Sequence, residues 1–81
     1  MTTTKTYNGW TNRATWNLAL WLTNDAAAYE WMREHFTCVR PNRRTVQEFC
    51  LNAYPNGFTP DGESLENVNW TEIVDMVRES L

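Results

Sequence analysis

The first clear pattern of apolar positions covers residues 11–23. Thr11 or Asn12 is a typical helix cap, and the residues that follow repeat with helical spacing. At about 100° per residue, only Arg13 and Asn17 share a polar wedge. The other directions are covered by apolar side chains: Trp16, Leu18, Leu20, Trp21 and Leu22. A helix that is apolar nearly all round is expected to lie at the centre of the fold.

A second helix is predicted over residues 26–36. Asn24 and Asp25 can end the first helix and cap this one. One face of it is apolar at positions i, i+3, i+4, i+7 and i+8, with the residues Ala28, Trp31, Met32, His35 and Phe36. We expect this face, Trp31 included, to point into the core.

Two further helices follow connections that contain proline. The third begins either at Pro41 or with a capping box formed by Thr45 and Glu48, and its apolar face holds Val46, Phe49, Cys50 and Ala53. Two Pro-x-Gly clusters, residues 55–57 and 60–62, end it. In the fourth, Asn69 is the cap with Glu72 three positions on, and the buried face is predicted to be Trp70, Ile73, Val74, Val77 and Leu81.

The pattern therefore predicts an all-α fold: a compact three- or four-helix domain around a central, Trp-rich helix. Residues 7–81 are expected to form this single domain. Residues 1–6 are polar, Thr-rich and without periodicity, which predicts a flexible N-terminus. At the start of the domain, Asn8-Gly9 stands between two aromatic residues, Tyr7 and Trp10. This arrangement predicts either a plain turn or a short hairpin.

Composition agrees with one small globular domain. The chain has 81 residues, and its 14% aromatic residues supply much of the area that so short a chain can bury. It has neither an apolar run of membrane-spanning length nor an N-terminal segment of signal-peptide type. We therefore expect a cytoplasmic protein without membrane contact. Cys38 and Cys50 are too few for a disulfide scaffold and are expected to be reduced.

Charge is distributed unevenly between the two halves of the chain. Residues 1–44 hold six basic and three acidic side chains, whereas residues 45–81 hold one basic and seven acidic side chains. The net charge of −3 conceals this asymmetry. A dipolar molecule is expected unless folding interleaves the halves.

Residues with catalytic or metal-binding chemistry are sparse. The single histidine, His35, lies on the apolar stripe of the second helix, and the phosphate-binding, dinucleotide and nucleophile-elbow motifs are all missing. His35, Cys38 and Cys50 could offer three zinc ligands, but the second close ligand pair of a structural zinc site is missing. We therefore expect no enzyme activity, no catalytic residue, no cofactor and no metal.

Seven residues stand out as candidates for contact with a partner. Arg40, Arg43 and Arg44 lie near a helix start, where positive charge opposes the helix dipole, although Arg44 can also pair with Glu48. Glu72, Asp75 and Glu79 share the outer face of the fourth helix, where they can meet a basic partner or simply be solvated. Trp10 precedes the first helix and either staples its end or stays exposed.

Residues 7–25 resemble the opening of a family of small proteins from phages, archaeal viruses and other mobile elements. The shared motif is Y-N-G-W-T-N-x-x-T-W-N, followed by an apolar helix and Asn-Asp. Asn69, Trp70 and Ile73 resemble the end of the family more loosely, and the middle of the chain departs from any such pattern.

This resemblance implies an accessory protein of a virus or mobile element that binds a host protein. Such proteins often bind components of host defence, which points to an inhibitor of the anti-CRISPR or anti-restriction type. Two alternatives stay open. One is a nucleic-acid-binding protein that uses the arginines and Trp10, and the other is a structural or oligomeric part of a virion.

Overall fold

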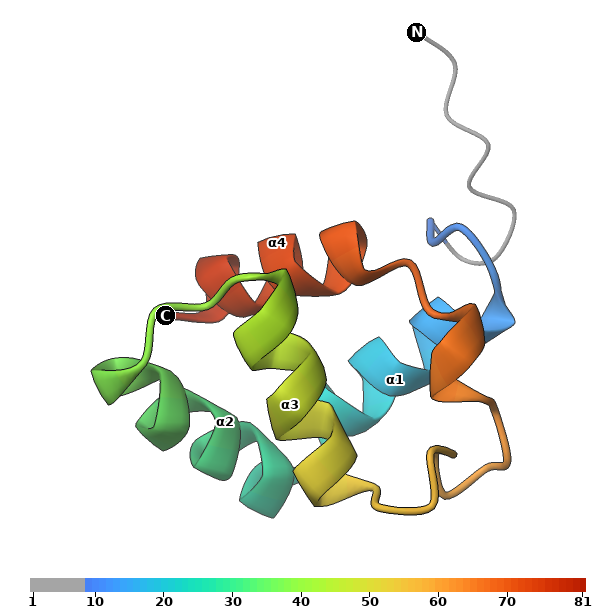
Figure 1. Ribbon diagram of the computed structural model, residues 1–81, viewed down its shortest axis with the longest axis horizontal. Coiled ribbons are helices and arrows are strands. Elements are labelled where there is room, and N and C mark those ends of the chain that lie inside the picture. Colours follow the sequence, from blue (N-terminus) through green and yellow to red (C-terminus); the bar gives the residue numbers. More distant parts are fainter. Residues whose placement is uncertain (1–8) are drawn as a thin grey trace, which may run out of the picture.

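A computed structural model describes residues 9–81, and this part of the chain is all-α, as predicted (Figure 1). It contains four α-helices and one 3₁₀ turn: α1 (Arg13–Asn24), α2 (Ala26–Cys38), α3 (Arg43–Ala53), η1 (Leu65–Asn67) and α4 (Trp70–Ser80). The predicted flexible segment, residues 1–6, lies outside the described residues, as do Tyr7 and Asn8 of the predicted turn.

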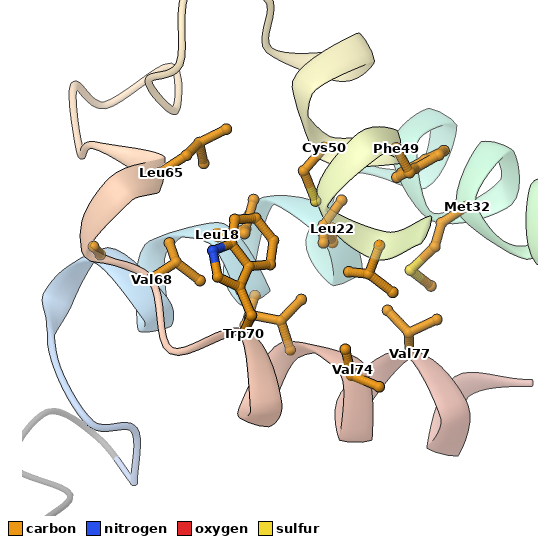
Figure 2. Close-up of a cluster of buried hydrophobic side chains, with 14 of the residues drawn as sticks. Leu18, Leu22, Met32, Phe49, Cys50, Leu65, Val68, Trp70, Val74 and Val77 are labelled. Carbon is orange, nitrogen blue, oxygen red and sulfur yellow. The ribbon is translucent and has the colours of Figure 1, made fainter. Parts of the chain in front are cut away.

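Helix α1 is the central element, because α2, α4 and η1 all pack against it, while α3 packs on α4 (Figure 1). Its Leu18 and Leu22 are 0% and 1% exposed. Figure 2 shows the side chains of the other elements gathering around these two residues. The prediction of a central first helix is therefore confirmed.

The five tryptophans differ widely in burial, which corrects part of the sequence reading. Trp70 is 9% exposed and is directed from α4 into the core (Figure 2). Trp16 and Trp21 are only half-buried, and Trp31 is 46% exposed. The prediction that Trp31 points into the core is wrong. Its ring lies on the side chain of Phe49, with ring centroids 4.8 Å apart, while Met32 and Phe36 take the buried side of α2.

Leu81 is the second residue whose predicted burial is wrong, since it is 50% exposed. It is the C-cap of α4, and its half-exposed side chain lines a surface hollow with residues of α2, among them Phe36 and Thr37. Ile73, Val74 and Val77 are buried as the helical spacing predicted.

Three of the four predicted caps are confirmed. The side chains of Asn12, Asp25 and Asn69 accept hydrogen bonds from the first backbone N–H groups of α1, α2 and α4. Helix α3 begins at neither predicted position. Asn42 is its cap: the Asn42 side chain accepts from the Thr45 N–H, and the Thr45 hydroxyl accepts from the Asn42 N–H. Thr45 is thus the third residue of the helix, and Asn42 takes the capping role that was predicted for Thr45.

The starts of α1 and α4 are joined through the buried hydroxyl of Thr15. This hydroxyl donates to the cap side chain Asn12 at 2.7 Å and accepts from the Asn69 N–H at 2.8 Å. The Asn12 amide donates in turn to the Asn67 carbonyl at 2.8 Å. Both helix caps are therefore tied to each other as well as to their own helices.

The segment between α3 and η1 lies against the polar wedge of α1. Asp61 accepts from the amide of Asn17 at 2.8 Å and from the indole N–H of Trp21 at 3.1 Å. Arg13 and Glu63 form an ion pair at 2.8 Å. Asn17 is 0% exposed, so this segment covers the Asn17 end of the polar wedge, while Arg13 stays exposed.

Both cysteines are free thiols in different surroundings. Cys38 is exposed at the end of α2, whereas Cys50 is buried between α3 and the core. Burial raises the pKa of the Cys50 thiol to about 12. The reactive thiolate of Cys50 is therefore scarce at neutral pH.

We predict that Trp70→Ala lowers the free energy of unfolding by about 3–5 kcal/mol, the usual cost of deleting a buried large ring. Trp31→Ala removes a ring that is half in solvent, and its cost is expected to stay below about 2 kcal/mol. Urea unfolding followed by circular dichroism measures both. Equal losses would contradict the difference in burial.

We predict that only one thiol per folded chain reacts quickly with a maleimide at pH 7.5. Cys38 is accessible, while Cys50 is shielded and protonated. Mass spectrometry should show one adduct on the native protein and two adducts in guanidinium chloride. In Cys38→Ser, fast labelling of the native protein should disappear; its persistence would place Cys50 at the surface.

We predict a pH-dependent contribution to stability from Asp61. The hydrogen bonds from Asn17 and Trp21 lower the pKa of Asp61 from its ordinary value of 3.8. A lowered pKa in the folded state stabilises the fold fully above 3.8, and this stabilisation is lost as the pH falls through the lower value. Asp61→Asn should thus be less stable than the parent at pH 7, with the gap closing toward pH 2.

The matched control for this experiment is Glu66→Gln, which removes one exposed carboxylate that accepts no side-chain hydrogen bond within residues 9–81. Its stability gap should stay small at both pH values in urea unfolding. A gap for Asp61→Asn that is independent of pH would show that the carboxylate charge is not what holds the segment to α1.

Candidate functional site

The seven candidate contact residues form two separate groups in the structure. Trp10, Glu72, Asp75 and Glu79 line one hollow, together with Gly9 and Met76. The arginines Arg40, Arg43 and Arg44 are exposed around the start of α3, and none of them lines this hollow. The aromatic candidate is therefore placed with the carboxylates and apart from the basic cluster.

The hollow lies along α4 and has a volume of about 410 Å³. The α4 residues that line it follow helical spacing i, i+3, i+4 and i+7: Glu72, Asp75, Met76 and Glu79. The half-buried ring of Trp10 stands opposite this stripe. We call the group formed by Trp10, Glu72, Asp75 and Glu79 the acidic hollow.

Trp10 reaches the acidic hollow because the next residue is tied to α4. The Thr11 N–H donates to a carboxylate oxygen of Glu72 at 3.0 Å, and the Thr11 hydroxyl accepts from the Asn69 amide at 3.0 Å. Gly9 precedes Trp10 with a φ of +89°, a conformation that favours glycine. The cap region of α4 therefore determines where the Trp10 ring lies.

The three carboxylates differ in what they do. Glu72 is half-buried, and its carboxylate stabilises the fold by accepting a hydrogen bond from the Thr11 N–H. Asp75 and Glu79 are exposed, lie four residues apart on the helix, and have no ion pair within residues 9–81. Like charges at this spacing repel each other by a few tenths of a kcal/mol. Asp75 and Glu79 are thus available for a positively charged partner.

The basic cluster is larger in space than in sequence. Arg44 pairs with Glu48 at 3.5 Å, which confirms the expected i,i+4 contact. From α4, Arg78 donates to the Pro41 carbonyl at 3.3 Å, beside Arg40 in the chain. Figure 1 shows the end of α4 next to the connection between α2 and α3. Periodicity could not reveal this fourth arginine, because it depends on how the two helices cross.

A second hollow of about 180 Å³ adjoins the first and was missed from the sequence. It shares Trp10 and Met76 with the acidic hollow and is otherwise lined by α1 residues: Trp16, Ala19, Leu20 and Thr23. We call it the apolar hollow. The sequence did contain an indication of this hollow: α1 is apolar nearly all round, and its three neighbouring elements cannot cover every apolar side chain.

His35 packs among aromatic rings. Its ring centroid lies 4.8 Å from that of Phe36 and 5.2 Å from that of Phe49. Within residues 9–81, the acidic, histidine and cysteine side chains form no group of three or more that could hold a metal ion. The helices of this part of the chain are all too short or too polar to cross a membrane.

Comparison with known protein families gives a match over nearly the whole chain. The model of a family of unknown function, DUF7249, matches residues 3–80. The chain belongs to this family. No curated protein and no solved structure is significantly similar to it. The DUF7249 match spans all four helices and both hollows, but the family description carries no activity, so function has to be argued from the geometry above.

Proposed function

We propose that this DUF7249 protein is a non-enzymatic accessory protein of a phage or other mobile element that binds a host protein. The acidic hollow is the contact surface in this proposal. One observation carries it: Trp10 lies beside Glu72, Asp75 and Glu79 and away from the arginines.

The position of Trp10 separates the protein-binding from the nucleic-acid-binding hypothesis. Surfaces that bind single strands place aromatic rings along a positively charged groove, so that bases stack while phosphates are neutralised. Here the ring shares its hollow with three carboxylates, which repel phosphates. This arrangement favours a partner that carries positive side chains.

A half-buried tryptophan beside Asp75 and Glu79, which form no ion pair within residues 9–81, is typical of a protein interface. Trp is among the residues that most often dominate binding energy, because its large ring is desolvated on contact. Asp75 and Glu79 add charge complementarity, which steers a basic partner and increases the association rate. The two features together support binding to a basic protein surface.

The class of target follows from the resemblance of residues 7–25 to proteins of mobile elements. Enzymes that act on nucleic acids expose basic surfaces, because they must bind the phosphate backbone. A host defence nuclease of the CRISPR or restriction type offers such a surface to an acidic hollow. We therefore propose inhibition of a defence nuclease in the host cytoplasm as the biological role.

Binding of nucleic acid by the basic cluster is the second candidate. Arg78 favours it, since its side chain donates to the Pro41 carbonyl in the connection that carries Arg40 and leads to Arg43 and Arg44. Within residues 9–81, the cation–π contact that the structure shows is made by Arg33 over the Tyr29 ring and by none of these arginines. The contribution of the basic cluster would be electrostatic and would weaken steeply with salt.

We predict that Asp75→Lys/Glu79→Lys abolishes capture of the partner from host lysate by the tagged protein, because both charges at the contact are reversed. The matched control is Glu30→Lys/Glu34→Lys, which makes the same charge change at exposed i,i+4 positions on α2. The control and the triple variant Arg40→Ala/Arg43→Ala/Arg44→Ala should both retain the partner.

The triple arginine variant also tests the nucleic-acid-binding alternative. The parent protein should bind single- and double-stranded DNA and RNA no tighter than about 10 µM near physiological salt, within the usual range of non-specific contact. Tighter binding that the triple arginine variant loses, with the fold intact by circular dichroism, would replace the protein-partner proposal with the nucleic-acid alternative.

A further inference from the structure

Two helices contribute matching stripes to the surface that holds both hollows. On α4 the stripe is Glu72, Asp75, Met76 and Glu79, and on α1 it is Trp16, Ala19, Leu20 and Thr23. Each follows the spacing i, i+3, i+4 and i+7, so each is a single helix face. Helices α1 and α4 pack against each other, and Trp10 and Met76 line both hollows. The hollows therefore form one groove between two helices.

The two walls of this groove differ in chemistry. The α4 wall carries three carboxylates around Met76. The α1 wall is apolar: Trp16 and Leu20 are half-buried, and the Thr23 hydroxyl already donates to the Ala19 carbonyl at 2.8 Å. A ligand in the groove would meet apolar surface on one side and negative charge on the other.

We propose that the groove binds an amphipathic basic helix of the partner protein. This inference rests on the proposed function and specifies which element of the partner is bound. Apolar side chains of that helix, spaced i, i+3, i+4 and i+7, would pack on Trp16 and Leu20. Lysine or arginine side chains on the adjacent flank would lie along Asp75 and Glu79.

The length of the two stripes suits about two turns of a bound helix. Each stripe spans seven residue steps, roughly 10 Å along its axis, or about two helical turns. A third helix laid beside two packed helices meets them at the usual interaxial spacing of about 8–10 Å. Trp10 stands at the junction of the walls, where its ring can pack against an apolar side chain or receive a cation over its face.

Charge complementarity selects the partner helix over other occupants. The groove carries net negative charge, so an acidic or purely apolar helix would leave Asp75 and Glu79 without partners. A basic helix without an apolar face would leave Trp16 and Leu20 partly in water. Only a helix with both faces satisfies both walls.

The test uses synthetic peptides of about 18 residues, long enough to form a helix on binding. The first has leucines at helical spacing and lysines and arginines on the adjacent flank. The second has the same composition in an order that removes the amphipathic face, and the third replaces the basic residues with glutamate. Fluorescence anisotropy near physiological salt should show binding of the first peptide and at least about tenfold weaker binding of the other two.

Protein variants test each wall separately. Asp75→Lys/Glu79→Lys and Leu20→Gln should each weaken the first peptide at least about tenfold. Glu30→Lys/Glu34→Lys controls for charge, and Leu51→Gln controls for loss of a half-exposed leucine on α3. Circular dichroism checks each fold, and Thr23→Arg, at an exposed position, replaces Leu20→Gln if that variant unfolds.

Nuclear magnetic resonance locates the contact: the first peptide should shift the backbone amide signals of residues 16–23 and 72–79. Shifts elsewhere, or no binding of the first peptide, would overturn the inference. So would equal binding of the scrambled peptide or an effect of Leu20→Gln no larger than that of Leu51→Gln. A dimer that Asp75→Lys/Glu79→Lys dissolves in sedimentation would identify a second copy as the occupant and overturn it as well.

These results are distinguishable from failure of the proposed function. If lysate capture still depends on Asp75 and Glu79 while the peptides fail, the acidic hollow binds a protein by another element. If Asp75→Lys/Glu79→Lys captures the partner from lysate as well as the parent protein does, the proposed function itself is wrong.

Discussion

The hydroxyl of Thr15 holds together the two helix starts on which the rest of the molecule depends. It donates to Asn12, the cap of α1, and accepts from the backbone N–H of Asn69, the cap of α4. Thr15 is 0% exposed, and a buried hydroxyl without partners would be costly. This bond aligns α4 beside α1, which lets Leu18 and Ile73 share one core and leaves a groove on the outer side of the pair.

The polar residues of the N-terminal motif have structural roles that explain their spacing. Asn12 and Thr15 form the cap network, and the Thr11 N–H donates to the Glu72 carboxylate. Asn17, two residues further along α1, donates to Asp61 and so holds the segment before η1. The motif therefore specifies how distant segments are attached to α1, while the same contacts hold the half-buried ring of Trp10 against the core and in the wall of the acidic hollow.

The surface proposed for function contains features that lower the stability of the free domain. Trp16 and Leu20 remain half in solvent although α1 is the central helix, and Asp75 and Glu79 repel each other on α4. Such local choices are unfavourable for a free domain and become favourable when a basic, apolar partner covers them. Arg78 lies three residues after Asp75 on the same helix and donates to the Pro41 carbonyl, so α4 carries both charge signs on its exposed surface.

The sequence by itself determined the helical class, the order of the helices, most caps and the face of α4 that carries the carboxylates, because these depend on spacing within about two turns. The tertiary structure decided that Trp70 is buried while Trp31 is exposed, since burial depends on which neighbour covers a helix face. It also placed Trp10 beside carboxylates more than 60 residues away in sequence, through the bond from Thr11 to Glu72. Helical periodicity identifies which residues share a face, but the packing of one helix on another determines what that face meets.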